Sequence, residues 1–192
     1  MAAPKNIIYM IGDGMGPAYL SAYRYYMDNP ATKAVEPTIF DELWVGVATT
    51  YPDDDTIVTD SAAGATALST RHKSYNGAIS VDHDHNKLTT MLEIAKHQGK
   101  LTGVVATAQI NHATPAAFIA HNKTRKAYDE IANDYFDNKV DGKFVADLMF
   151  GGGISYFERQ DRNLTQQFKK AGYQYANSWQ DFNKINALPA LA

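Results

Sequence analysis

The chain has 192 residues, of which 45% are hydrophobic and 20% are charged, and this is enough apolar material for one sizeable buried core. Its formal net charge of -3 argues against a nucleic-acid-binding surface, and no uncharged apolar run is long enough to span a bilayer. Because the chain has no cysteine, disulfides and thiolate metal sites are excluded, so any metal must be bound by Asp, Glu, His or hydroxyl groups. We expect one domain, or part of one, that acts on a soluble partner or substrate.

The chain begins without the hydrophobic stretch of a signal peptide, because residues 1–5 lead directly into an apolar run. We expect either a cytoplasmic protein or an exported one whose leader has been replaced by a start Met. The apolar run, residues 6–11, predicts a buried parallel strand that ends in a glycine-rich turn at residues 12–16. A helix is predicted from Pro17 through about Met27.

Asp13 lies between two glycines in that turn, at the carboxyl end of the predicted strand, where open α/β sheets bind ligands. A turn carboxylate that bonds its own backbone would give the same pattern, and this alternative stays open. A dinucleotide fingerprint is excluded, since Pro17 stands where the third glycine belongs and a carboxylate would repel a pyrophosphate.

The next segment contains one hydroxyl at the junction between extended chain and a helix. A short helix at residues 39–43 and a second strand at 45–48 precede an acidic loop, residues 53–55. Residues 57–58 are expected to be extended, and the small residues 62–68 to be helical. Ser61 then lies where unpaired N–H groups and the helix dipole favour an anion such as phosphate. An ordinary N-capping Ser remains the alternative.

Two features of the central chain predict loops. Asn76-Gly77 is a hairpin signal. Residues 81–85 include His83 and His85, which would share a face of an extended segment and suggest a metal cluster, but a polar loop reads the same way and is favoured.

The remaining chain alternates strands and helices. We predict a helix over residues 89–98, a strand over 101–107, and a helix over 116–121 that Thr114 caps and Pro115 begins. Strand, helix and strand in succession predict an α/β fold with a central, mostly parallel sheet flanked by helices on both faces. Further helices are expected through residue 134, at 163–171 and at 178–184, with an apolar segment at 144–149.

His112 and Thr114 are two residues apart at a predicted strand-to-helix junction, so both side chains can face the same crevice. A structural, hydrogen-bonded histidine is the alternative at His112, and a simple surface charge is the alternative at Arg125. We treat His72 and His97 as surface residues.

Four stretches together resemble the alkaline phosphatase family in order, spacing and local sequence: residues 6–16, 59–67, 70–82 and 112–125. They contain Gly-Asp-Gly-Met-Gly at 12–16, Thr-Asp-Ser-Ala-Ala at 59–63, Tyr-Asn-Gly-Ala at 75–78 and Ala-Thr-Pro-Ala-Ala at 113–117. The resemblance implies the family's three-layer α/β fold and a hydrolase of phosphate monoesters. It also favours the loop interpretation of His83 and His85, because the family usually has a variable loop there.

The resemblance implies two Zn²⁺ ions, one Mg²⁺ ion and a covalent intermediate on Ser61. Asp13 matches the carboxylate that bridges a zinc ion and the magnesium ion, and Thr114 matches a hydroxyl ligand of the magnesium site. His112 stands where family members carry Asp or His, and a histidine makes that site less purely oxygen. Arg125 matches the arginine that clamps the phosphate, and Asp60 matches the carboxylate that orients it. A metal ion in place of a general base agrees with the sequence, since no His or Lys has a spacing that guarantees a base beside Ser61.

The family's other metal ligands have no counterpart here, because no histidine follows His121. We therefore expect residues 1–192 to be the N-terminal portion of one alkaline-phosphatase-like domain whose C-terminal metal-ligand half is not present. The resemblance further implies small phosphate monoesters as substrates, inorganic phosphate as product inhibitor, a homodimer, and a periplasmic or secreted location.

Two alternatives to a phosphomonoesterase remain from the sequence. A phosphodiesterase or sulfatase would use the same scaffold, although sulfatases need a modified Cys or Ser in a different motif. A non-catalytic phosphate- or metal-binding module would apply if the chain is complete as it stands.

Overall fold

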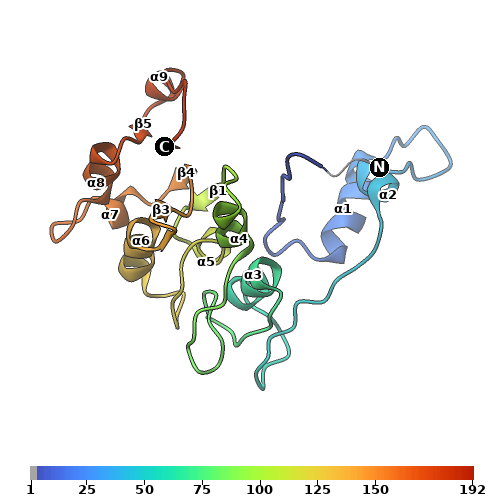
Figure 1. Ribbon diagram of the computed structural model, residues 1–192. Helices are drawn as coiled ribbons and strands as arrows, with labels where there is room; N and C mark the ends of the chain where they lie inside the picture. The colour runs from blue at the N-terminus through green and yellow to red at the C-terminus, as the bar shows by residue number, and fades with distance from the viewer. Residues whose placement is uncertain (1–3) are drawn as a thin grey trace. The chain divides into compact units, whose positions relative to one another are not determined.

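The computed structural model describes residues 4–192 and divides the chain into two compact units, Met1–Thr49 and Thr50–Ala192 (Figure 1). Residues 1–3, the start of the segment that we expected to lack a signal-peptide core, lie outside the described residues. Among the described residues, no helix has the length and apolar character needed to cross a membrane.

The described part of the first unit contains two helices, both at the positions that the sequence predicts. They are α1 (Pro17–Met27) and α2 (Ile39–Leu43). The Asp41 carboxylate accepts a hydrogen bond from the Thr38 N–H at 2.8 Å, which caps the start of α2. The same carboxylate pairs with Arg24, with 3.2 Å between Arg24 Nε and Asp41 Oδ2, and so ties α1 to α2.

The predicted strands at residues 6–11 and 45–48 are not strands in the structure, and this corrects the sequence analysis. Both runs are extended or irregular and exposed, with Ile8 88% and Val45 fully exposed. A strand is stabilised by the neighbour with which it pairs, and the described part of the first unit contains helices and no strand. Residues 57–58, in the second unit, are likewise exposed and outside any strand.

The second unit is built on a four-stranded parallel sheet in the order β1-β4-β6-β5. Its strands are β1 (Gly103–Gln109), β4 (Leu148–Gly152), β6 (Ala190–Leu191) and β5 (Gln174–Tyr175). Gly103 pairs with Leu148, and Leu148 pairs with Ala190, so β4 lies in the middle of the sheet. Such an all-parallel arrangement, with helices between successive strands, confirms the predicted α/β class with a mostly parallel sheet flanked by helices.

Seven helices in the described residues belong to this unit: α3 (Ser61–Thr70), α4 (Met91–His97), α5 (Ala113–Ala116), α6 (Tyr128–Asp137), α7 (Ile154–Phe157), α8 (Leu164–Lys170) and α9 (Trp179–Phe182). Helix α6 packs against both α7 and α8, as Figure 1 shows, and α3 packs against α5. A cluster of aromatic rings fills the core beside α6 and α8, with Phe168 in edge contact with Phe136 and Tyr173 at 5.0 and 4.9 Å between centroids. The buried core therefore includes this aromatic cluster, and it also includes the alanines of α3 and α5 such as Ala63 and Ala116.

Helix α5 (Ala113–Ala116) begins two residues before Pro115, where it was predicted to start, and it ends at Ala116, so the predicted continuation through residue 121 is wrong. His112 is the N-cap by its extended backbone, so Thr114 lies within the first turn instead of capping it. Pro115 is tolerated there because the first N–H groups of a helix have no intrahelical partner anyway.

The structure also contains a small hairpin that the sequence analysis missed. It pairs β2 (Lys139–Val140) with β3 (Lys143–Phe144) in antiparallel orientation. Asp141 and Gly142 connect the strands with positive φ angles of 51° and 75°, and an Asp-Gly pair is a strong signal for such a turn. Asn76-Gly77, which we took for a hairpin signal, forms a turn without flanking strands.

Candidate active site

Asp60, and not Ser61, caps helix α3, which corrects one sequence expectation. Asp60 has extended backbone angles, and its Oδ1 accepts a hydrogen bond from the Ala63 N–H at 2.9 Å. Ser61 is the first helical residue, and its side chain is half-buried at the end of the helix that offers N–H groups. Ala62 and Ala63 behind it are buried, so the helix start is anchored in the unit.

The second oxygen of the same carboxylate binds Arg125. Asp60 Oδ2 lies 3.0 Å from Arg125 Nη1, and the two side chains are 28% and 22% exposed. Arg125 is 65 residues away along the chain, yet its backbone N–H is also fixed, by the Gly77 carbonyl at 2.7 Å. A guanidinium has five N–H donors in a planar fork, and a single Asp60 contact uses one of them. The structure therefore places the Arg125 guanidinium beside Asp60, the residue that precedes Ser61.

His112 also reaches this arginine. Its Nε2 lies 3.2 Å from Arg125 Nη2, with the imidazole nitrogen as acceptor. Thr114 lies two residues further on α5, is half-buried, and belongs to the helix that packs on α3. Asp60, Ser61, His112, Thr114 and Arg125 thus all belong to the second unit. The expectation that His112 and Thr114 face one crevice stays a prediction.

Asp13 belongs to the first unit. Its turn is closed by a hydrogen bond from the Met15 N–H to the Gly12 carbonyl at 3.1 Å, and Gly14 has a φ of +67°, which glycine adopts without strain. Asp13 itself is exposed. The expectation that it bridges two metal ions stays a prediction.

Residues 81–85 form the loop that the sequence favoured. Asp82 organises it by accepting backbone hydrogen bonds from Asp84 and Asn86 at 2.9 and 2.8 Å. These bonds, with the Asn86 side-chain bond as the largest contribution, lower the pKa of Asp82. Within residues 4–192, no three His, Asp or Glu side chains gather in a way that could hold a metal ion.

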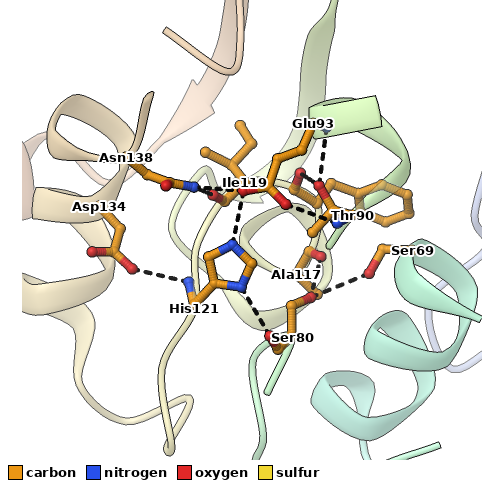
Figure 2. A network of polar contacts seen from close by, with 10 residues as sticks. Ser69, Ser80, Thr90, Glu93, Ala117, Ile119, His121, Asp134 and Asn138 are labelled. Carbon is orange, nitrogen blue, oxygen red and sulfur yellow. Dashed lines mark hydrogen bonds and ion pairs between the residues drawn. The ribbon is translucent and has the colours of Figure 1, made fainter. Parts of the chain in front are cut away.

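Figure 2 shows a buried polar network around Glu93 and His121 that the sequence analysis missed. His121 Nδ1 contacts the Ser80 carbonyl at 2.8 Å, and Nε2 contacts Glu93 Oε1 at 2.9 Å. The Asn138 amide donates to the same Glu93 oxygen at 2.9 Å, and the His121 N–H donates to Asp134 at 2.9 Å. The network joins α4 and α6 to the chain at Ser80, Ile119 and His121.

The charge of Glu93 is stabilised by these contacts. Burial raises its pKa, but hydrogen bonds from the imidazole, the Thr90 N–H and the Asn138 amide outweigh burial and lower the pKa to about 2. At Asp134, burial outweighs the hydrogen bond from the His121 N–H, so the pKa is raised. The spacing of Thr90 and Glu93, a capping box in sequence, was the available signal for this carboxylate.

Comparison with known proteins identifies the family of the chain. The profile of the family described as Alkaline phosphatase matches residues 4–190. Alkaline phosphatase 3 of Bacillus subtilis (strain 168) is 56% identical over 181 residues, which cover 94% of this chain and 39% of that protein. The cold-active alkaline phosphatase of the psychrophile Shewanella sp. has a similar structure, with a TM-score of 0.85, 50% identity, and coverage of 94% of this chain and 44% of that one.

A variant of the TAB5 alkaline phosphatase with Mg bound in its M3 site is also similar, with a TM-score of 0.77, 32% identity, and coverage of 93% of this chain and 49% of that one. The chain spans about two fifths of the length of the curated relatives that it matches. The profile match extends over nearly all of its residues, from the glycine-rich turn of Asp13 to the last strand of the sheet. The chain belongs to the alkaline phosphatase family.

Proposed function

We propose that a protein containing this chain hydrolyses phosphate monoesters through a phosphoserine intermediate on Ser61. The observation that carries the proposal is the Asp60–Arg125 pair, which holds a guanidinium at the N-terminal end of α3, next to the residue that begins the helix. The helix N-terminus and the guanidinium both favour a phosphate group. Family membership supports hydrolysis of phosphate esters as the reaction.

In the first step, the Ser61 hydroxyl loses its proton to solvent and the Oγ–P bond forms, while the bond from phosphorus to the leaving oxygen breaks and that oxygen takes up a proton to leave as the alcohol. In the second step, a water molecule loses a proton and attacks phosphorus, the Oγ–P bond breaks, Ser61 Oγ regains a proton and inorganic phosphate leaves. Negative charge on the non-bridging phosphate oxygens is stabilised by Arg125, and Asp60 orients the arginine fork. The recognised group is the phosphate itself, so the substrates are small phosphate monoesters, and inorganic phosphate inhibits as the product.

The donor chemistry of the proposed metal ligands fits two Zn²⁺ ions and one Mg²⁺ ion. Asp13, Ser61 and Thr114 offer oxygen atoms, which suit magnesium and zinc, and His112 offers an imidazole, which suits zinc. Bound metal ions would supply the charge that favours a serine alkoxide and a hydroxide at neutral pH. The TAB5 variant with Mg in its M3 site supports magnesium as one of the ions.

The described residues alone do not complete such a centre. They contain no group of three His, Asp or Glu that could hold a metal, and His112 Nε2 already faces Arg125 at 3.2 Å. We therefore propose that the chain is the N-terminal portion of one phosphatase domain. The relatives' further length would then supply the remaining ligands. From family membership we also propose a homodimer in the periplasm or outside the cell.

The test uses the full-length protein that carries this chain, a chromogenic aryl phosphate as substrate, and the variant Ser61→Ala. Ser155→Ala on α7, an exposed serine away from α3, is the matched control. We expect Ser61→Ala to lower turnover at least about 10⁴-fold and the control to leave it unchanged. Acid quenching of the wild type with labelled phosphate should trap the label on the peptide that contains Ser61.

Turnover that survives Ser61→Ala, or a label on another residue, would overturn the phosphoserine step. Tight binding of inorganic phosphate without any turnover in the wild type would indicate a binding module instead of an enzyme.

A further inference from the structure

Asn76 lies in a turn between α3 and the sheet, and its side-chain amide contacts the chain that leads into the proposed site. Its Oδ1 accepts a hydrogen bond from the Asp60 N–H at 2.7 Å. Its Nδ2 donates to the Val58 carbonyl at 2.9 Å and to Thr56 Oγ1 at 2.8 Å. One amide thus fixes three positions of the five-residue segment that precedes Ser61, a segment with no strand pairing of its own.

The turn is held from the other side as well. The Asn76 N–H donates to Asp54 Oδ2 at 2.8 Å, and Asp54 Oδ1 accepts from the Thr56 N–H at 2.7 Å. These contacts lower the pKa of Asp54, the Thr56 side-chain bond most, so the carboxylate remains ionised as an acceptor. Asp54 of the acidic loop at residues 53–55 therefore holds the Asn76 turn in place.

The same turn also fixes the arginine. The Gly77 carbonyl accepts the Arg125 N–H at 2.7 Å. Two residues later, Ile79 and Asn122 exchange both backbone hydrogen bonds at 2.9 Å, so the chains on either side of the turn run together. Asp60 and Arg125 are thus positioned by adjacent residues of one turn, and their 3.0 Å ion pair closes the loop of contacts.

We propose that Asn76 is a positioning residue for phosphate binding and for transfer to Ser61. This assignment of Asn76 rests on the proposed function of the site. By fixing the Asp60 backbone against the turn that holds Arg125, the amide sets the distance between the helix start and the guanidinium. Only a side chain with one acceptor and two donors at this length makes the three contacts. Displacement of a clamp by about 1 Å costs on the order of 10²-fold in rate, so the effect is measurable although Asn76 lies outside the reacting groups.

The experiment compares Asn76→Ala with Asn163→Ala in the full-length protein. Asn163 caps α8 by accepting from the Gln166 N–H at 2.9 Å and from Thr165 Oγ1 at 2.9 Å, so its loss removes comparable hydrogen bonds far along the chain from the site. We expect Asn76→Ala to raise the inhibition constant of inorganic phosphate about tenfold and to lower kcat/KM about 30-fold, on the scale of a misplaced clamp. Both constants should be unchanged in Asn163→Ala, while both variants lose thermal stability.

A double variant distinguishes positioning from general weakening. Because Asn76 acts through the arginine, Asn76→Ala should change phosphate inhibition less than about twofold in an Arg125→Ala background. Equal kinetics in the two asparagine variants, or fully additive effects with Arg125→Ala, would overturn the proposal. Asn76→Asp keeps the acceptor and replaces the donors, so it should shift phosphate inhibition in the same direction if Asn76→Ala does not fold. An unchanged constant in Asn76→Asp contradicts the proposal.

The proposed function can fail separately. If Asn76→Ala leaves phosphate inhibition and kcat/KM unchanged while Ser61→Ala is inactive, only the role of Asn76 is refuted. Activity that survives Ser61→Ala refutes the phosphoserine mechanism, whatever Asn76→Ala does.

Discussion

The two regions that carry the predicted site residues are held in different ways. At the start of α3, hydrogen bonds join residues 16 and 65 positions apart, from Asp60 to Asn76 and to Arg125. In the turn that carries Asp13, the backbone hydrogen bonds join residues two and three positions apart. The proposed phosphate-binding region is thus held by contacts between residues far apart in the sequence, all within one unit. The hydrogen bonds of the Asp13 turn fix only its local backbone, and they do not indicate which other residues would bind the same metal ion.

Removal of metal tests the proposed role of the Asp13 turn and should have the largest effect on activity. If the centre needs Asp13 and further ligands, a chelator should lower hydrolysis by the full-length protein at least about 10³-fold, since the charge that activates the nucleophile is lost. Zinc and magnesium together should restore it. Asp13→Ala should raise the metal concentration needed for half-maximal activity, whereas Asp28→Ala, which loses a loop contact to the Glu36 N–H in the same unit, should not. Full activity in chelator would contradict the metal proposal.

Replacement of Arg125 tests the long-range region directly. Arg125→Ala should raise the inhibition constant of inorganic phosphate about 100-fold and Arg125→Lys about tenfold, because lysine keeps the charge but not the planar fork. Competitive inhibition of aryl phosphate hydrolysis measures both. Arg162→Lys is the matched control, since it breaks a two-bond pair with Asp137 at 2.6 and 2.7 Å outside the site. An unchanged inhibition constant in Arg125→Ala would show that the arginine does not bind phosphate.

Elements with local signals could be predicted from the sequence. Pro17 begins α1, Thr90 with Glu93 caps α4, and the helix at 163–171 is found as α8. In contrast, the apolar run at residues 6–11 has the composition of a buried strand but no ladder in the described part of its unit. Strand formation depends on a partner elsewhere in the chain, and composition does not name that partner.

The same division holds for the candidate site. The position of Ser61 at a helix start follows from the small residues after it, but the pairing of Asp60 with Arg125 came only from the family resemblance. No spacing rule links residues 65 positions apart. Asn76 was noted for its turn signal alone, because a side-chain amide that braces another segment leaves no periodic pattern in the sequence.

The hydrogen-bond network around Glu93 and His121 predicts that the stability of the fold depends on pH. With a folded pKa of about 2 and an ordinary value of 4.5, Glu93 stabilises the fold fully above about pH 4.5, and this contribution is lost as the pH falls toward 2. The shift corresponds to about 3 kcal/mol. Glu93→Gln should therefore lower the free energy of unfolding by about 2–3 kcal/mol at pH 7, and by roughly half as much at pH 3.

Urea denaturation at the two pH values measures the Glu93 effect. Asp161→Asn is the control, because its carboxylate is 72% exposed and solvent screens its pair with Arg159, so the change should alter stability far less than Glu93→Gln. A loss for Glu93→Gln that does not shrink with acid would contradict the assigned pKa.

The smallest effects are expected from two variants that separate the two roles of the Asp60 carboxylate. One oxygen caps α3 through the Ala63 N–H, and the other pairs with Arg125. Asp60→Asn keeps a capping oxygen but loses the charge, whereas Asp60→Ala loses both. Phosphate inhibition should weaken about fivefold in both variants, since the arginine loses its orienting partner. Only Asp60→Ala should also lose about 1 kcal/mol of stability from the missing cap. Equal stabilities in Asp60→Asn and Asp60→Ala would show that the carboxylate serves the arginine alone, and unchanged phosphate inhibition in both would show that it serves the helix alone.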